Sequence, residues 1–272
     1  MKKIRVVLAI SALFGLLCFV FACNRKPPRN SRKGPEQNAR EAKTIIKNDV
    51  PFFTDDFQSG VLNEKKWKTT RANDFRDGSV KVVNVGKGNA RDCKLRISAD
   101  TIGTAENSVK YIGVRCLEEV DFTKPKIITF DLDWNHQANG CYLGAAMYIC
   151  PTVTDKTASG QPDWIKFEYV GVPPGKNARF QVLREIGGNL RSIYDGGWPQ
   201  KDREGRKIDK VHLRIAISRA GLEVVENGRR LFSTKSPGLN FTKGYAYFEM
   251  SSHSNYPSRS IFFDNISFRN AR

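Results

Sequence analysis

Short apolar runs separated by turn residues dominate the chain from residue 51 onward. The runs are rich in Val, Ile, Phe and Tyr, and Gly, Pro, Asn or Asp interrupts them at intervals of roughly a dozen residues. No long stretch shows the 3.6-residue period of an amphipathic helix. This pattern predicts an all-β fold. The expected strands cover residues 93–99, 110–120, 127–134, 142–149, 164–170, 179–185, 190–194, 245–250 and 261–268.

The clearest hairpin lies in residues 210–232. Apolar residues alternate with polar ones from Val211 to Ile217, and a second apolar run ends at the dipeptide Asn227-Gly228. Asn-Gly between two alternating runs is typical of a type I′ turn. About 220 residues in this pattern, without an internal repeat, predict one large antiparallel β-sandwich over residues 51–272.

The N-terminus has the layout of a secretory signal. Lys2, Lys3 and Arg5 precede an uncharged apolar run over residues 6–22. At about 1.5 Å per residue this run reaches only roughly 26 Å, short of the ~30 Å hydrocarbon core of a bilayer. We therefore expect residues 1–22 to be removed by cleavage.

The next segment, residues 23–50, is rich in Lys, Arg, Pro and Gly and has almost no apolar periodicity. Such a composition cannot bury a core. We expect a disordered basic tether between the signal and the sandwich.

The end of the apolar run, Val20-Phe21-Ala22-Cys23, resembles the lipobox of bacterial lipoproteins, although Phe21 departs from the small residue usual there. The resemblance implies that Cys23 carries a lipid and that the protein is anchored in the cell envelope. Asn24 in place of aspartate points to the outer membrane in enteric-type sorting. Simple secretion and an uncleaved anchor are the alternatives.

The formal net charge is +17. Such a surface favours anionic partners. For an exported protein these are acidic polysaccharides, lipopolysaccharide phosphates, teichoic acids or anionic lipids, and nucleic acid is not expected. The charge alone is also compatible with solubility and general surface attraction.

Four cysteines remain in the body of the chain: Cys93, Cys116, Cys141 and Cys150. An even number in an oxidising compartment indicates disulfides. Cys93 and Cys116 lie on two strand-like runs separated by a turn, so a bridge across those strands is the expected connectivity. The spacing leaves Cys141 and Cys150 without an assigned pairing.

Three segments together resemble the concanavalin A-like lectin and glucanase superfamily, over roughly residues 51–270. They are the opening Phe-Thr-Asp-Asp-Phe of residues 53–57, the hairpin of residues 215–231 and the closing Phe-Asp-Asn-Ile-Ser-Phe of residues 263–268. The resemblance implies a jelly roll of two curved antiparallel sheets, with glycans bound across the concave sheet.

The strand 164–170 is similar to the catalytic strand of family 16 glycoside hydrolases, which reads Glu-x-Asp-x-Glu. Trp164 and Lys166 replace the first two carboxylates, and Glu168 stands at the acid/base position. Retaining hydrolysis requires two carboxyl groups about 5 to 5.5 Å apart. We therefore expect that mechanism to fail. Glu168 is then either an exposed residue paired with Lys166 or a neighbouring Arg, or a general acid/base in another reaction, such as that of a lyase.

Trp164 shares a strand face with Lys166 and Glu168, because alternate residues of a strand point the same way. An indole on that polar face suits the apolar side of a sugar ring. Packing beneath the loop of residues 151–163 is the alternative. Trp134 shares a strand face with Ile128, Phe130 and Leu132 and is expected in the core.

Other polar and aromatic residues fall in predicted loops, where a ligand contact or ordinary loop chemistry would explain them equally. They are His136, Trp198, His253, Asn255 and Tyr256.

On a regular strand Asp264 shares its side with Phe262, Ile266 and Phe268, so its carboxylate needs compensation on an apolar side. The resemblance implies a structural calcium there, with Asp55 or Asp56 contributing oxygen ligands. A bulge or a backbone hydrogen bond would serve equally well. No other cofactor is required.

The leading hypothesis is a lipid-anchored, lectin-like module that binds an anionic polysaccharide through Trp164, Lys166 and Glu168 without catalysis. The second is a glycan-cleaving enzyme, a hydrolase or a lyase, that uses Glu168 with a histidine or tyrosine partner. The third is an envelope scaffold or adhesin that binds a protein.

Overall fold

The computed structural model describes residues 50–71, 77–104, 109–134, 143–171, 179–196 and 210–271. In these ranges the chain forms fifteen β-strands and one short 3₁₀ turn, η1 (Ala158–Gly160), and it contains no α-helix. No helix in this part of the chain is long and apolar enough to cross a membrane.

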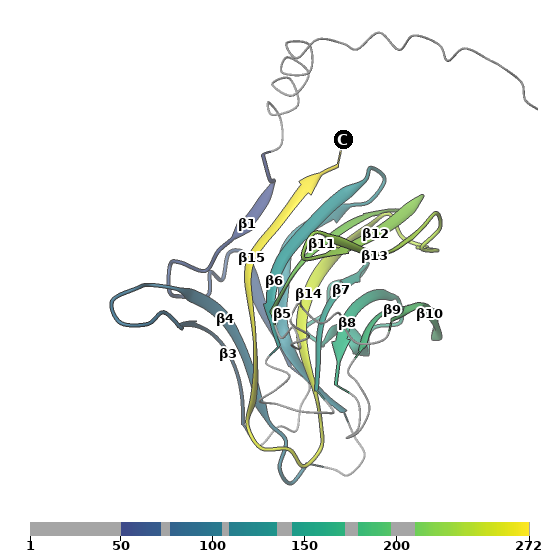
Figure 1. Cartoon of the computed structure of the whole chain (residues 1–272). Helices are drawn as coiled ribbons and strands as arrows, with labels where there is room; N and C mark the ends of the chain where they lie inside the picture. The colour runs from purple at the N-terminus through teal and green to yellow at the C-terminus, as the bar shows by residue number, and fades with distance from the viewer. Residues whose placement is uncertain are drawn as a thin grey trace, which may run out of the picture. The chain divides into compact units, whose positions relative to one another are not determined.

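The strands form two antiparallel sheets (Figure 1). Sheet A has the order β13 (Arg229–Thr234), β12 (Gly221–Glu226), β11 (Lys210–Ser218), β6 (Lys126–Asp133), β15 (Arg259–Asn270), β4 (Cys93–Asp100) and β3 (Asp77–Asn84), and β1 (Phe53–Asp55) also pairs with β15. Sheet B has the order β10 (Asn189–Asp195), β9 (Arg179–Ile186), β8 (Trp164–Val170), β7 (Leu143–Cys150), β14 (Lys243–His253), β5 (Val109–Asp121) and β2 (Trp67–Arg71). The predicted two-sheet sandwich is confirmed.

Every strand expected from the apolar runs is present, and the Asn227-Gly228 turn joins β12 to β13 with both residues at positive φ. The apolar runs did not predict β2 and β3, which are edge strands of sheets B and A. Both carry mostly polar residues, WKTTR and DGSVKVVN, because a terminal strand buries less of its surface.

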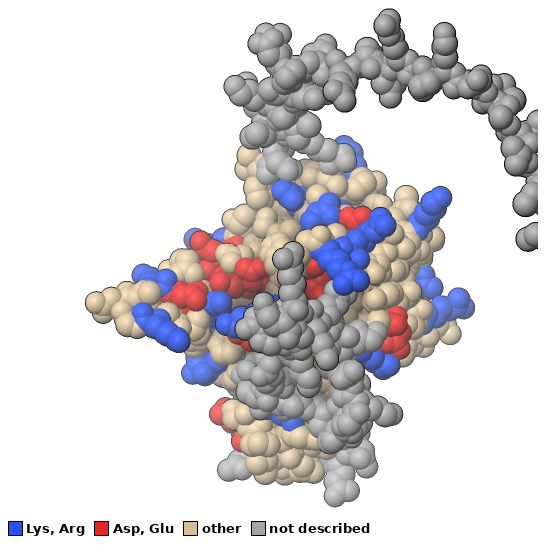
Figure 2. Space-filling view, in the orientation of Figure 1, with Lys and Arg blue, Asp and Glu red and all other residues tan. Residues whose placement is uncertain are grey.

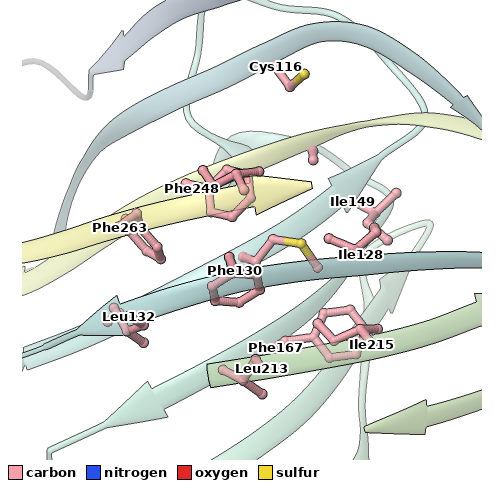
Figure 3. Close-up of a cluster of buried hydrophobic side chains, with 14 of the residues drawn as sticks. Cys116, Ile128, Phe130, Leu132, Ile149, Phe167, Leu213, Ile215, Phe248 and Phe263 are labelled. Carbon is pink, nitrogen blue, oxygen red and sulfur yellow. The ribbon is translucent and has the colours of Figure 1, made fainter. Parts of the chain in front are cut away.

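The core lies between the sheets and is built by alternation along each strand (Figure 3). On β8, Ile165 and Phe167 point into it, and the aromatic rings of Phe130, Phe248 and Phe263 meet there with centroids 5.2 to 5.9 Å apart. Trp134 is fully buried in the same core, as predicted.

A bulge in β15 changes which residues face the core. Phe263 points inward, the register with β6 shifts between Asp264 and Ser267, and Ile266 then takes the inward position. Asn265 adopts a φ of 50° at the bulge, and its backbone N–H donates to the Asp264 carboxylate at 2.8 Å. Asp264 therefore does not share the apolar side with Ile266, and the strict alternation assumed for this strand is wrong.

The predicted disulfide between Cys93 and Cys116 is also wrong. Cys93 lies in β4 of sheet A opposite Asn84, whereas Cys116 lies in β5 of sheet B opposite Trp67. The two strands do not pair, and neither cysteine forms a disulfide. Both residues and Cys150 are buried free thiols, and burial raises the pKa of Cys116 to about 12.

Candidate functional site

The face of sheet B that points away from the core carries the predicted site residues of β8. Trp164, Lys166 and Glu168 share this outer face, opposite Ile165 and Phe167. However, the three residues are only 5%, 9% and 4% exposed. The expected solvent-exposed polar surface is in fact a buried polar layer.

Glu168 has two charged or polar partners. The Lys166 ammonium lies 2.9 Å from Glu168 Oε2, and the Gln181 amide on β9 donates to the same oxygen at 2.6 Å. The Lys166 ammonium also lies 5.5 Å from the ring centre of Tyr148 and 5.7 Å from that of Trp164. These contacts stabilise Glu168 as a carboxylate in a site from which water is largely excluded.

A second carboxylate, Glu249, lies on the same face and was not among the predicted residues. Ala146 of β7 is the register partner of Glu168 on one side and of Glu249 on the other. The two glutamates therefore sit on one row of the sheet with a single alanine between them. The alternation of Glu249 with buried Phe248 and Met250 points it outward, but the strand order that brings it near Glu168 is not readable from local sequence.

Glu249 has a different environment from Glu168. Its Oε1 accepts hydrogen bonds from the backbone N–H of Ala158 at 2.7 Å and from the Thr70 hydroxyl at 3.3 Å. Its Oε2 is buried without a hydrogen-bond partner in the described part of the chain. Burial raises the pKa of Glu249 to about 7, although Ala158, Thr70 and Lys166 act in the opposite direction.

Glycines on neighbouring strands make room for both carboxylates. A Cβ added to Gly144 on β7 would lie 2.6 Å from Glu168 Oε1, and one added to Gly113 on β5 would lie 2.8 Å from Glu249 Cγ. Both contacts are closer than real Cβ atoms make. The floor between the two glutamates is thus built from Gly144 and Ala146 of β7, and Gly113 lies on the far side of Glu249, on β5.

Two tyrosines complete the site. Burial raises the pKa of Tyr111 to about 12 and that of Tyr148 well above its usual value, and in both cases Glu168 and Glu249 add to the effect. The phenols therefore remain protonated near both carboxylates and can donate hydrogen bonds. We call the following set the carboxylate cluster: Tyr111, Tyr148, Lys166, Glu168, Gln181 and Glu249.

The loop of residues 151–163, here called the covering loop, lies over part of this face. Its Ala158 packs with Tyr148, Trp164 and Tyr247 in a hydrophobic cluster separate from the main core. The Tyr247 hydroxyl donates to a backbone carbonyl of the loop at 3.3 Å. Trp164 thus packs beneath the covering loop, which was the alternative to an exposed indole. Its indole N–H is buried without a hydrogen-bond partner among the described residues.

The predicted cluster before the last strand is tied to the loop that follows β4. Thr101 donates from its hydroxyl to the His253 carbonyl at 2.6 Å and from its N–H to the Tyr256 carbonyl at 2.9 Å. Asn255 holds a φ of 62°, and the Arg259 guanidinium lies 3.5 Å from the ring centre of Tyr256. These contacts give the cluster a structural role, although His253 shares the outer face of β14 with Glu249.

Some predicted residues lie outside the described ranges. They are Cys23, His136, Cys141 and Trp198, together with the signal and nearly all of the tether.

The predicted calcium ligands face two separate pockets. Asp55 and Asp56 line one pocket with Asn265, whereas Asp264 lines another with Asp131. Burial raises the pKa of Asp264 to about 6, which weakens its tendency to ionise without a cation. No group of three or more His, Cys, Asp or Glu in the described part of the chain could hold a metal ion. Structural calcium therefore stays a prediction.

No protein-family model and no curated protein matches this chain. Several solved structures share its fold. The catalytic domain of an endo-1,3-beta-glucanase (laminarinase) from Thermotoga petrophila RKU-1 is 12% identical, with a TM-score of 0.55, over 84% of this chain and 100% of that one. The T. cruzi calreticulin globular domain is 13% identical, with a TM-score of 0.55, over 82% of this chain and 89% of that one.

A Bacteroides ovatus mixed linkage glucan GH16 protein, in complex with a G4G4G3G product, is 11% identical, with a TM-score of 0.54, over 79% of this chain and 99% of that one. A protein with a galectin-like fold from Bacillus subtilis has a TM-score of 0.53 at 11% identity, over 82% of this chain and 97% of that one. At such identities the likeness shows the fold alone. The predicted concanavalin A-like jelly roll is confirmed at that level.

Proposed function

We propose that this chain binds a polysaccharide on the outer face of sheet B, at the carboxylate cluster. The observation that carries the proposal is the buried row of ionisable side chains on a face that the sandwich core does not use. Burying Glu168, Lys166 and Glu249 costs free energy that an apolar layer would not. Such a row is typical of a ligand site.

The chemistry of the cluster fits sugar hydroxyl groups. Carboxylate oxygens accept hydrogen bonds, and the Lys166 ammonium, the Gln181 amide and the two phenols donate them. Tyr148 and Trp164 supply rings for the apolar side of a sugar. The solved structures with this fold include glucan-cleaving proteins, which supports a carbohydrate ligand.

Access to the cluster requires the covering loop to lift. Around Ala158 the loop is held by one hydrogen bond to Glu249, one from Tyr247 and the ion pair of Lys68 with Asp155 at 2.6 Å. That ion pair is exposed and contributes little to stability.

At the C-terminal end of the covering loop, Asp163 accepts hydrogen bonds from the Gly187 backbone at 3.0 Å and the Asn240 amide at 3.2 Å, and the Pro162 carbonyl accepts one from Gly188. Lifting the segment around Ala158 breaks its bonds to Glu249 and Tyr247 and unpacks Ala158, while the Asp163 end stays attached. Such a partial opening costs less free energy than unfolding the sheet.

An anionic polysaccharide is the preferred ligand class, because the formal net charge is +17. Basic and acidic side chains both occur on the face shown in Figure 2. We further propose that Cys23 carries a lipid and holds the protein in the cell envelope, at the outer membrane. Cys23→Ser should move the protein from the membrane fraction to the soluble fraction.

Affinity electrophoresis tests the binding proposal with laminarin, lichenan, polygalacturonate and chondroitin sulfate in the gel. The chain should be retarded by at least one of them, most strongly by an acidic one. Gln181→Ala should weaken the retardation at least about tenfold, since each lost hydrogen bond to a charged group is worth roughly 1.5–3 kcal/mol.

His212→Ala is the matched control, because His212 lies on the outer face of sheet A, 2.6 Å from Asp131. It should leave the retardation unchanged. A protein partner recovered by crosslinking, with no retardation by any polysaccharide, would favour the scaffold alternative.

A further inference from the structure

Glu168 and Glu249 occupy one row of sheet B, two strands apart. A spacing of about 4.8 Å between neighbouring strands puts their Cα atoms roughly 9.6 Å apart. The residue between them is Ala146, and Gly144 and Gly113 clear the space around each carboxyl group. The row therefore holds two carboxyl groups over a floor of small side chains.

The two carboxyl groups are set up for different roles. Glu168 is held as a carboxylate by Lys166 and Gln181, at 2.9 and 2.6 Å. Glu249 uses Oε1 to accept two hydrogen bonds and leaves Oε2 without a partner among the described residues. One group is thus a base and the other can carry a proton on a free oxygen, which is the usual arrangement of an acid and a base in one site.

We propose that this pair hydrolyses a glycosidic bond in the polysaccharide, with Glu168 as general base and Glu249 as general acid. The inference rests on the proposed glycan binding at the carboxylate cluster. The strand 164–170 alone lacks the second carboxylate that hydrolysis requires, and Glu249 of β14 supplies it.

The reaction consumes one water molecule. Glu168 takes a proton from the water while the water oxygen forms a bond to the anomeric carbon. The bond from that carbon to the leaving sugar oxygen breaks, and the leaving oxygen takes the proton of Glu249. Transfer of a proton from Glu168 to Glu249 through solvent restores both groups.

The separation of the two glutamates favours inversion at the anomeric carbon. Inverting enzymes hold their carboxyl groups about 6.5–9.5 Å apart to admit the water, whereas retaining enzymes hold them about 5–5.5 Å apart. The Cα atoms of Glu168 and Glu249 lie roughly 9.6 Å apart with one strand between them, which leaves room for a water molecule between two side chains that project from the same face. A general acid that titrates near pH 7 also suits catalysis at neutral pH.

The test combines binding and cleavage by the purified full chain. Each of laminarin, lichenan, polygalacturonate and chondroitin sulfate is scored for retardation in a gel and for release of reducing ends. The configuration of the first product is read by proton NMR. The proposal predicts reducing ends of inverted configuration from a polysaccharide that the chain binds, with a rate that falls as Glu249 ionises above about pH 7.

Glu249→Gln and Glu168→Gln should each lower the rate roughly 10²–10⁴-fold. Glu223→Gln is the matched control, because Glu223 lies in sheet A, 2.8 Å from Arg214, and this change should leave the rate unaltered. Should Glu249→Gln fail to fold, Glu249→Asp keeps the acid but withdraws it by one methylene, and a rate loss of about 10²-fold is expected.

The outcomes separate the two proposals. Binding without cleavage overturns the hydrolytic pair and leaves the glycan-binding function standing. Unsaturated uronate products would also overturn it, because they show elimination in place of hydrolysis. The absence of binding to every polysaccharide overturns the binding function and, with it, this inference.

Discussion

Lys166 and Glu168 form an ion pair that is almost completely removed from water, with side chains 11% and 5% exposed. A buried pair of this kind adds little stability compared with an apolar replacement, but removing one partner leaves a buried charge. The pair is therefore best tested as a unit.

Lys166→Met should lower the free energy of unfolding by about 3–5 kcal/mol, since Glu168 then keeps only the Gln181 amide. The double variant Lys166→Met with Glu168→Gln should recover most of that loss, because no charge remains unpaired. Urea denaturation of the four proteins measures the coupling. A double variant as unstable as the sum of the two single variants would contradict the account.

Glu249 predicts a dependence of stability on pH. Its pKa rises from 4.5 to about 7 in the folded protein, so the folded state holds a proton that the unfolded state has released between these values. The contribution is fully present below about pH 4.5 and is lost as the pH rises through about 7. It amounts to about 3 kcal/mol.

Glu249→Gln removes this titration. The difference in unfolding free energy between wild type and variant should therefore shift by about 3 kcal/mol in favour of the variant from pH 4.5 to 8. A difference that stays constant over this range would show that Glu249 is ionised throughout.

Gly144→Ala should disturb the site more than the fold. The new methyl would clash with the Ser251 hydroxyl and would lie 2.6 Å from Glu168 Oε1, which are the ends of two side chains and not backbone atoms. We expect a stability loss of about 1 kcal/mol by urea denaturation and a loss of polysaccharide retardation of at least about tenfold. Gly221→Ala is the control, because its nearest neighbour is 3.7 Å away, and it should leave the retardation intact.

At the residue scale, the sequence predicts which side chains share a face but not what lies above them. Alternation was sufficient to group Trp164, Lys166 and Glu168. Their burial depends on the covering loop, whose contacts with Tyr247 and Glu249 join positions some ninety residues apart in sequence. Local patterns carry no information about such contacts.

At the element scale, β15 shows where strict alternation fails. The bulge at Asn265 moves the core positions from Phe263 to Ile266 and leaves Asp264 outside. The same limitation explains the disulfide error: two neighbouring runs in sequence were taken as paired strands, but they lie in different sheets. By contrast, the Asn227-Gly228 hairpin was predictable, because a two-residue turn fixes the pairing locally.

The bulge gives a prediction for Asn265, which has a φ of 50°. Asn265→Val should cost about 1–2 kcal/mol more than Asn265→Gly, because a β-branched residue is strained in the left-handed region whereas glycine is not. Both changes remove the hydrogen bond from the Asn265 amide to Asp131, so the comparison isolates the backbone. Equal unfolding midpoints in urea would argue against the bulge.

At the scale of the whole molecule, the fold was predictable because many strands agree with one architecture. The site was not, because it depends on sheet order: β7 separates β8 from β14 and brings Glu168 and Glu249 onto one row. The net charge predicts an anionic partner, and the N-terminal pattern predicts a lipid anchor. Contacts within the sandwich test neither prediction.

The central claim is that sugar binds on the outer face of sheet B. Titration of the isotope-labelled chain with oligosaccharides of a bound polysaccharide, followed by backbone amide NMR shifts, tests it most directly. The account predicts that the largest shifts map to β7, β8 and β14, around Ala146, Glu168 and Glu249. Shifts confined to the pocket on sheet A, around Lys94, Asp131 and His212, would contradict it.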